Sequence, residues 1–131
     1  MPQKPIELIL ARQLAGYLSI PIFVVDADGT LLFYNEPAEA MLGRRFEEAG
    51  EMRLDLWSTT FLPTDEAGSP LPTEALPLVI ALRERRPVHK IIGITGFGGV
   101  RRLIEVTAFP LEGQGGRHLG AVAAFWSMEG S

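Results

Sequence analysis

The dipeptide Asp28-Gly29 stands between two runs of β-branched and aromatic residues, at 20–26 and 30–34. Asp-Gly in that setting is a strong hairpin signal, because a tight turn needs positive φ angles that Asp and Gly tolerate. The wider motif that starts at Asp26 lacks the remaining ligand positions of a calcium loop, so we interpret it as a turn alone. The sequence therefore predicts antiparallel pairing near the N-terminus.

A short helix is expected directly after the second strand, over residues 36–42. Asn35 is a suitable N-cap, Pro37 suits a first turn, and Gly43 suits the C-terminal end. These signals are local, and together they predict both ends of the helix.

Residues 44–72 are the least regular stretch and predict short helical turns and loops. A longer helix is expected over 73–86, where Pro77 marks the first regular turn because a later proline would break the hydrogen-bond ladder. Three further strands are expected over residues 88–95, 101–110 and 117–126. The glycine clusters between these strands lack the helix, Lys and Ser or Thr that follow a phosphate loop, so we interpret them as hairpin loops.

The length of 131 residues suits one domain. The element order is a helix, two strands, short helices, a longer helix and three strands. With hairpins at both ends, this order predicts an α+β domain, in which short helices cover one face of a five-stranded antiparallel sheet.

Residues 5–18 predict an amphipathic N-terminal helix, because apolar residues recur there at every fourth position. The stripe comprises Ile6, Leu10, Leu14 and Leu18. It either packs on its own domain or forms a dimer contact, and both interpretations remain open. We expect residues 1–18 to form this helical segment and residues 19–128 to form the folded domain.

The last two predicted strands are largely apolar on both faces, whereas a half-buried sheet normally has a polar outer face. Alternation groups Ile104 and Val106 on one face of the penultimate strand. We place Val122 and Ala124 of the last strand on that same inner face. The other face is too apolar to leave in water, so we expect a homodimer to cover it. The predicted dimer interface comprises Ile6, Leu10, Leu14, Leu103, Phe109, Leu119 and Phe125.

Composition excludes several classes of function. The net charge of −4 provides no broad positive field for nucleic acid. The absence of cysteine excludes disulfides, thiolate metal ligands and thiol nucleophiles, and it fits a reducing compartment. No apolar run resembles a signal peptide or a membrane span of ~20 residues, so we expect a cytoplasmic protein without a membrane segment.

Few residues suggest a catalytic or metal-binding role. The histidines, His89 and His118, lie on predicted strands with no carboxylate or second histidine at metal-ligand spacing. The serines lack the context of a nucleophile elbow. We therefore expect no catalytic residue, no metal site and no enzymatic activity.

The run from Ile20 to Asn35, continued to Leu42-Gly43, resembles the N-terminal half of a PAS domain. The shared features are a hydrophobic strand that ends in Asp, an Asp-Gly turn, a strand that ends in Asn, and a helix that ends in Leu-Gly. Residues 65–86 resemble the linker and long F helix of that family, and the resemblance extends over about residues 18–128.

The resemblance implies a sensory or regulatory module for signal transduction. PAS domains bind a small ligand between the sheet and its helices, or signal through dimer contacts, and usually control an effector. The family's Asp-Ile/Val-Thr exit motif is absent after the last strand, so a signalling effector acting in trans is an expected partner; a stand-alone protein and a fragment both remain open. The expected ligand-binding residues are Met41, Trp57, Leu78, Val79, Leu82, Ile104, Val106, Val122 and Ala124.

The resemblance also bears on cofactors. Flavin photoreceptors of the LOV type and coumarate photoreceptors need a cysteine, which this chain lacks. Haem PAS domains usually carry a histidine on the F helix, and residues 73–86 contain none, so haem is not expected. We retain an unknown small apolar ligand and a non-covalent flavin, which Trp57 would stack on.

The alternative function is a protein-interaction or dimerisation module with a filled core and no ligand. A pocket for a ligand or cofactor requires a cavity of roughly 300 Å³ or more. A filled core requires close packing at a density of about 0.75.

Overall fold

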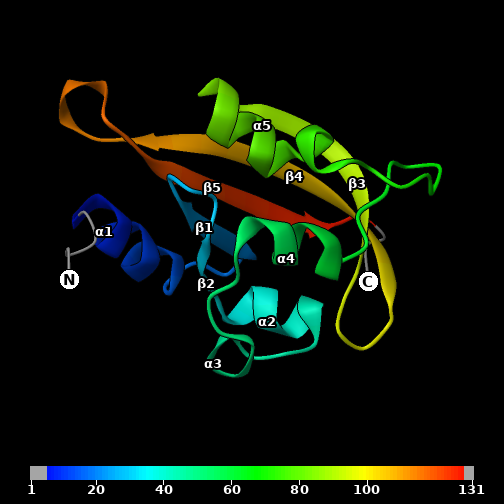
Figure 1. Cartoon of the computed structure of the whole chain (residues 1–131). Helices are drawn as coiled ribbons and strands as arrows, with labels where there is room; N and C mark the ends of the chain where they lie inside the picture. Colours follow the sequence, from blue (N-terminus) through cyan, green and yellow to red (C-terminus); the bar gives the residue numbers. More distant parts are fainter. Residues whose placement is uncertain (1–5, 129–131) are drawn as a thin grey trace.

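The computed structural model describes residues 6–128, so residue 5 of the predicted N-terminal helix lies outside the described residues. The elements are α1 (Ile6–Ala15), β1 (Ile22–Asp26), β2 (Leu31–Tyr34), α2 (Glu36–Leu42), α3 (Phe46–Ala49), α4 (Leu54–Thr60), a 3-10 turn (Thr73–Ala75), α5 (Pro77–Glu84), β3 (Val88–Thr95), β4 (Arg101–Glu112), a second 3-10 turn (Gln114–Gly116) and β5 (His118–Ser127), as Figure 1 shows.

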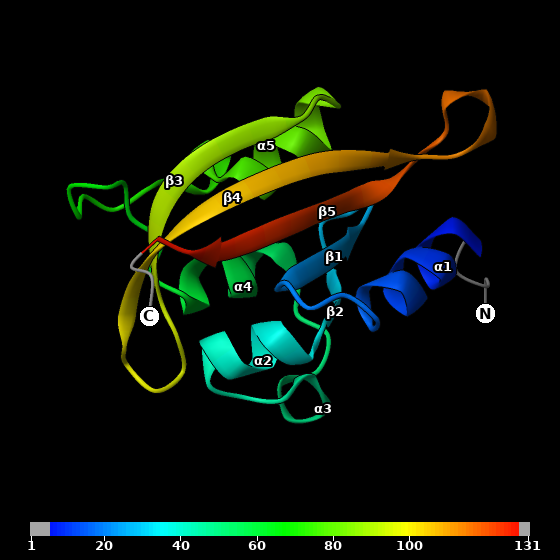
Figure 2. The ribbon, with the colours of Figure 1, turned by 180° about the vertical axis from the view of Figure 1, so that it is seen from behind.

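The strands form one five-stranded antiparallel sheet in the order β2-β1-β5-β4-β3. The first and last strands are neighbours at its centre, where the N-terminal hairpin joins the C-terminal three strands. Helices α2, α4 and α5 lie on one face, and Figure 2 shows β3, β4 and β5 from the opposite side. This arrangement confirms the predicted α+β fold.

The local signals of the first hairpin and of α2 act as expected. The carboxylate of Asp26 accepts hydrogen bonds from the backbone N–H groups of Asp28 and Thr30, each at 3.0 Å. Asn35 caps α2 by accepting from the N–H of Ala38, and Gly43 ends the helix in the left-handed conformation. The structure confirms both predictions.

The helix predicted over residues 73–86 is shorter than expected. Only Pro77–Glu84 is α-helical, because Leu76 is extended and separates it from the preceding 3-10 turn. Pro77 therefore begins the regular helix, as its missing N–H allows.

The predicted inner and outer faces of β5 are reversed. Val106 lies opposite Phe125 and Ala108 lies opposite Ala123, so Phe125 and Ala123 share the inner face with Val106. The neighbouring residues Val122 and Ala124 pack with the cluster on the outer face. The placement of Val122 and Ala124 inside, and of Phe125 outside, was therefore wrong.

A β-bulge explains why Leu119 nevertheless lies on the outer side. Leu111 lies opposite Gly120 and Glu112 opposite His118, so Leu119 is an extra residue on β5. The alternation along the strand changes phase there. Gly120 passes so close to β1 that a Cβ atom would overlap the carbonyl oxygen of Val25, which only glycine avoids.

Helix α1 covers part of the outer face with residues other than the predicted stripe. Its buried side chains are Leu8 and Ala15, which pack against β1, β2 and β5. The stripe residues Ile6, Leu10 and Leu14 are 66%, 54% and 61% exposed. The helix thus has apolar residues on two sides. Within residues 6–128, no helix is long and apolar enough to cross a membrane.

Candidate ligand cavity

A small cavity of about 80 Å³ lies between the inner face of the sheet and the segment that runs from α4 to α5. Its lining is almost entirely apolar. The lining residues are Phe23, Leu42, Trp57, Ser58, Phe61, Pro63, Leu76, Pro77, Leu78, Ile92, Ile94, Ile104, Val106, Ala123 and Phe125.

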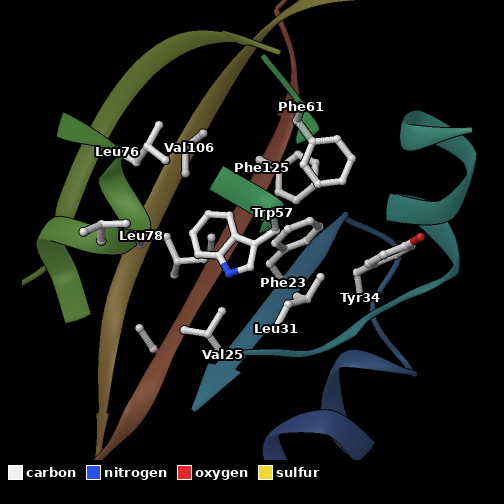
Figure 3. Close-up of a cluster of buried hydrophobic side chains, with 14 of the residues drawn as sticks. Phe23, Val25, Leu31, Tyr34, Trp57, Phe61, Leu76, Leu78, Val106 and Phe125 are labelled. Atoms are coloured by element: carbon white, nitrogen blue, oxygen red, sulfur yellow. The ribbon is translucent and has the colours of Figure 1, made fainter. Parts of the chain in front are cut away.

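Aromatic rings occupy much of the space beside the cavity, as Figure 3 shows. The ring of Phe23 on β1 stacks on Tyr34, with centroids 5.4 Å apart. The same ring makes edge contacts with Phe61, Trp57 and Phe125 at 6.0, 6.4 and 5.6 Å. Such arrangements stabilise a core beyond its area burial. The rings therefore pack against one another around a small free volume.

The indole of Trp57 is held in place by a hydrogen bond. Its Nε1–H donates to the carbonyl oxygen of Gly29 at 2.8 Å, which joins α4 to the turn between β1 and β2. The bond satisfies the polar atom of a buried ring. The indole that this bond holds is among the residues that line the cavity.

Polar groups are scarce among the side chains that line this cavity. Ser58 contributes a buried hydroxyl, whose oxygen lies 3.5 Å from the hydroxyl oxygen of Thr73. No ionisable side chain is among the lining residues. An apolar surface of this kind favours apolar groups and provides no acid, base or nucleophile.

The predicted ligand-binding residues divide into three groups. Trp57, Leu78, Ile104 and Val106 line the cavity. Met41, Val79 and Leu82 pack in the same core but do not line the cavity. Val122 and Ala124 lie on the outer face of the sheet. The prediction missed Phe125 and Ala123, which the pairing of β4 with β5 brings to the cavity.

Tyr34 is buried at the edge of this core. Its hydroxyl donates to the carbonyl oxygen of Arg44 at 2.8 Å. Burial, helped by the negative charge of Glu39, raises the pKa of Tyr34 to about 12. The phenol therefore stays neutral and acts as a structural hydrogen-bond donor.

The two histidines lie away from the cavity. On the outer face, the Nε2 atom of His89 lies 2.7 Å from a carboxylate oxygen of Glu105, and its Nδ1 atom lies 2.9 Å from the Thr107 hydroxyl. The other oxygen of Glu105 accepts from the indole N–H of Trp126. His118 lies near the bulge at the far end of β5. Within residues 6–128, no three His, Asp or Glu side chains gather as a metal site.

The predicted dimer residues are also separated by the fold. Ile6, Leu10 and Leu14 are exposed along α1, and Leu103 and Phe109 lie on the outer face of β4. Leu119 is buried under α1, and Phe125 is buried in the inner core. Phe125 is therefore unavailable to any partner.

The cavity does not fit a flavin. Its volume of about 80 Å³ is well below the several hundred Å³ that enclose a cofactor-sized ligand. The rings of Phe23, Trp57 and Phe125 would have to move to admit a fused ring system.

Comparisons with solved structures show the same fold. A PAS domain from Colwellia psychrerythraea is 19% identical, with a TM-score of 0.66, and the match covers 92% of this chain and 96% of that one. The Rhodobacter sphaeroides LOV protein is 12% identical, with a TM-score of 0.70 over 98% of this chain and 70% of that one. The PAS domain of nitrogen regulation protein NR(II) from Vibrio parahaemolyticus is 15% identical, with a TM-score of 0.63 and coverage of 91% and 98%.

A search of curated proteins found no match. The family model described as the PAS fold matches residues 17–129, which is most of the chain. The order of elements, the strand order and this match agree. The chain belongs to the PAS fold family.

Proposed function

We propose that this PAS domain is a sensory module that binds a small apolar ligand in its central cavity. PAS domains are generally sensory or signalling modules, and the family model matches residues 17–129 of this chain. The observation that carries the proposal is the apolar cavity between the sheet and the α4–α5 segment.

The cavity volume limits the ligand. An engineered apolar cavity of roughly 150 Å³ in another protein binds benzene or xenon. At about 80 Å³ the cavity is smaller than the roughly 300 Å³ expected of a ligand pocket, so it suits an apolar group of only a few carbon atoms. A small apolar molecule is therefore favoured over a non-covalent flavin.

Asn35 offers a route from the cavity to the N-terminal helix. Leu42 at the end of α2 lines the cavity, and Asn35 at the start of α2 bonds to α1. The amide nitrogen of Asn35 donates to the carbonyl oxygens of Ala15 and Ile20, each at 2.8 Å. Its amide oxygen accepts from the N–H groups of Ile22 and Ala38. A shift of α2 on ligand binding would therefore move α1.

Signalling through a homodimer is the second part of the proposal. The exposed residues of α1 lie beside a sheet face whose Phe109 and Trp126 are partly exposed. Apolar residues on both elements support a symmetric interface that a second copy covers. The effector would then act in trans, with the dimer as its target.

Xenon provides a test of the cavity. We expect xenon under pressure to shift the methyl NMR signals of Ile104 and Val106 in the full chain. Ala123→Leu fills the cavity and should abolish these shifts. Ala124→Leu is the matched control, because its side chain lies on the outer face of the same strand. Absence of xenon shifts in the wild type would contradict the ligand proposal.

Sedimentation tests the dimer. We expect a dimer at tens of micromolar that Leu10→Glu and Phe109→Glu dissociate. Leu56→Glu is the control, because this exposed residue lies on α4, on the opposite face of the sheet. A monomeric wild type would overturn the dimer.

The interaction module with a filled core is the second candidate. The apolar stripe on the outer side of α1 favours it, because an exposed stripe indicates a partner. A dimer that takes up no xenon would support this function over the sensory one.

A further inference from the structure

Arg102 lies on the inner face of β4, next to residues that line the cavity but not among them. It lies opposite Ile94 on β3 and two positions before Ile104 on its own strand. Both neighbours line the cavity. Since residues opposite each other or two apart share a face, the side chain of Arg102 starts beside the cavity wall.

The guanidinium of Arg102 is incompletely satisfied. Its Nε atom is buried and, within residues 6–128, has no hydrogen-bond partner. A guanidinium remains charged at any ordinary pH. A buried donor without an acceptor is unfavourable, and more so in a charged group. An anionic acceptor would remove that penalty.

The neighbouring arginines are engaged elsewhere. Arg101 donates to the hydroxyl of Thr64 at 3.0 Å, and the guanidinium of Arg44 lies 4.3 Å over the ring of Phe97. Neither is paired with a carboxylate in the described part of the chain, although other arginines are. The Nε atom of Arg102 is thus a donor without a partner, within residues 6–128, on the face of the sheet that carries the cavity.

We propose that the ligand is a small apolar carboxylate, with its hydrocarbon body in the cavity and its carboxylate on Arg102. This inference rests on the proposed function and specifies its ligand. The planar guanidinium matches a carboxylate with two parallel N–H···O bonds, which a neutral group makes less well. The cavity of about 80 Å³ limits the body to a short branched chain.

Isobutyrate and its neutral analogue isobutyramide provide the test, because they share a shape and differ in charge. We expect NMR titration of the full chain to show isobutyrate binding about tenfold or more tightly than isobutyramide, as a charge-assisted pair requires. Arg102→Gln should reduce isobutyrate affinity to that of isobutyramide. Arg101→Gln, the adjacent control on the outer face, should leave the preference unchanged.

The outcomes separate this inference from the proposed function. Equal affinities of the wild type for the two analogues, or full isobutyrate affinity in Arg102→Gln, would overturn the proposal that the ligand is a carboxylate. Xenon binding would in that case still support the proposed ligand cavity. If neither analogue nor xenon binds, both proposals fail.

A collapsed variant needs a separate measurement. If Arg102→Gln also loses isobutyramide and xenon, its cavity has closed, and Arg102→Lys then decides. Lys keeps the positive charge, so a variant that binds xenon and still prefers isobutyrate over isobutyramide supports the ion pair. A variant that binds xenon and shows no such preference contradicts it.

Discussion

At the scale of single residues, Asn35 connects several elements of the molecule's N-terminal half. It is 1% exposed, and its side chain makes four hydrogen bonds of 2.8–3.3 Å. These bonds join α1, the segment before β1, β1 itself and α2. A helix cap on the surface has one such role, whereas this residue satisfies buried groups on several elements.

Replacement of Asn35 should therefore destabilise the fold more than loss of a cap does. We expect Asn35→Ala to lower the free energy of unfolding by about 3 kcal/mol, since a lost cap costs ~1 kcal/mol and buried groups left unpaired cost more. Asn35→Asp keeps the capping oxygen but loses the amide N–H groups that donate to Ala15 and Ile20. The amides of α1 should therefore be less protected against hydrogen exchange in this variant. Urea unfolding measures the loss in Asn35→Ala, and hydrogen exchange measures the protection of α1 in Asn35→Asp. A loss of about 1 kcal/mol in Asn35→Ala would show that the contacts to α1 contribute little.

Tyr34 predicts a dependence of stability on alkaline pH. Its pKa is about 12 in the folded chain against 10.0 ordinarily, so the unfolded chain loses the proton first. The stability contribution is complete below pH 10 and is lost as pH rises toward 12. Wild type should therefore lose more stability than Tyr34→Phe across that window in thermal melts. Tyr17→Phe, at an exposed site, is the control, and identical slopes in all three proteins would refute this role.

At the scale of elements, the features set by local chemistry were predictable. The turn at Asp28-Gly29 and helix α2 depend on residues adjacent in sequence, and the structure has them as expected. The face of β5 depends on its register with β4 and on a bulge, and a shift by one residue exchanges the faces. Periodicity alone does not give the register between β4 and β5, so the prediction that Phe125 lies on the outer face was wrong.

The candidate site, like the fold, was predictable from the sequence only in part. Trp57 and Leu78 were predictable from the family resemblance, because apolar residues of the helices face the sheet. The cavity volume was not predictable, because it depends on how Phe23 and its neighbouring rings pack. In α1, the pattern identified an apolar stripe but not Leu8, the residue that actually contacts the sheet.

Helix α1 should respond to substitution on its buried side alone. Leu8→Ala removes a nearly buried side chain, and we expect it to lower the protection of α1 amides against hydrogen exchange by about 2 kcal/mol or more. Leu10→Ala, two residues away on the exposed side, should leave that protection within about 0.5 kcal/mol. Equal effects would mean that the helix docks differently in solution. The exchange is measured at a protein concentration below that at which the proposed dimer would form.

At the scale of the whole molecule, the sheet separates two apolar clusters. The inner cluster contains the cavity, and the outer cluster fixes α1 against β1, β2 and β5. Asn35 connects them through α2. A change in the inner cluster would therefore have a physical route to a helix on the other side of the sheet, as the proposed sensory function requires.

Hydrogen exchange with and without xenon, followed by NMR on the full chain, tests this central claim most directly. The account predicts changed protection both around the cavity and in α1, with the α1 change lost in Asn35→Asp. Changes confined to the cavity-lining segments, with α1 exchange unaltered in the wild type, would contradict it.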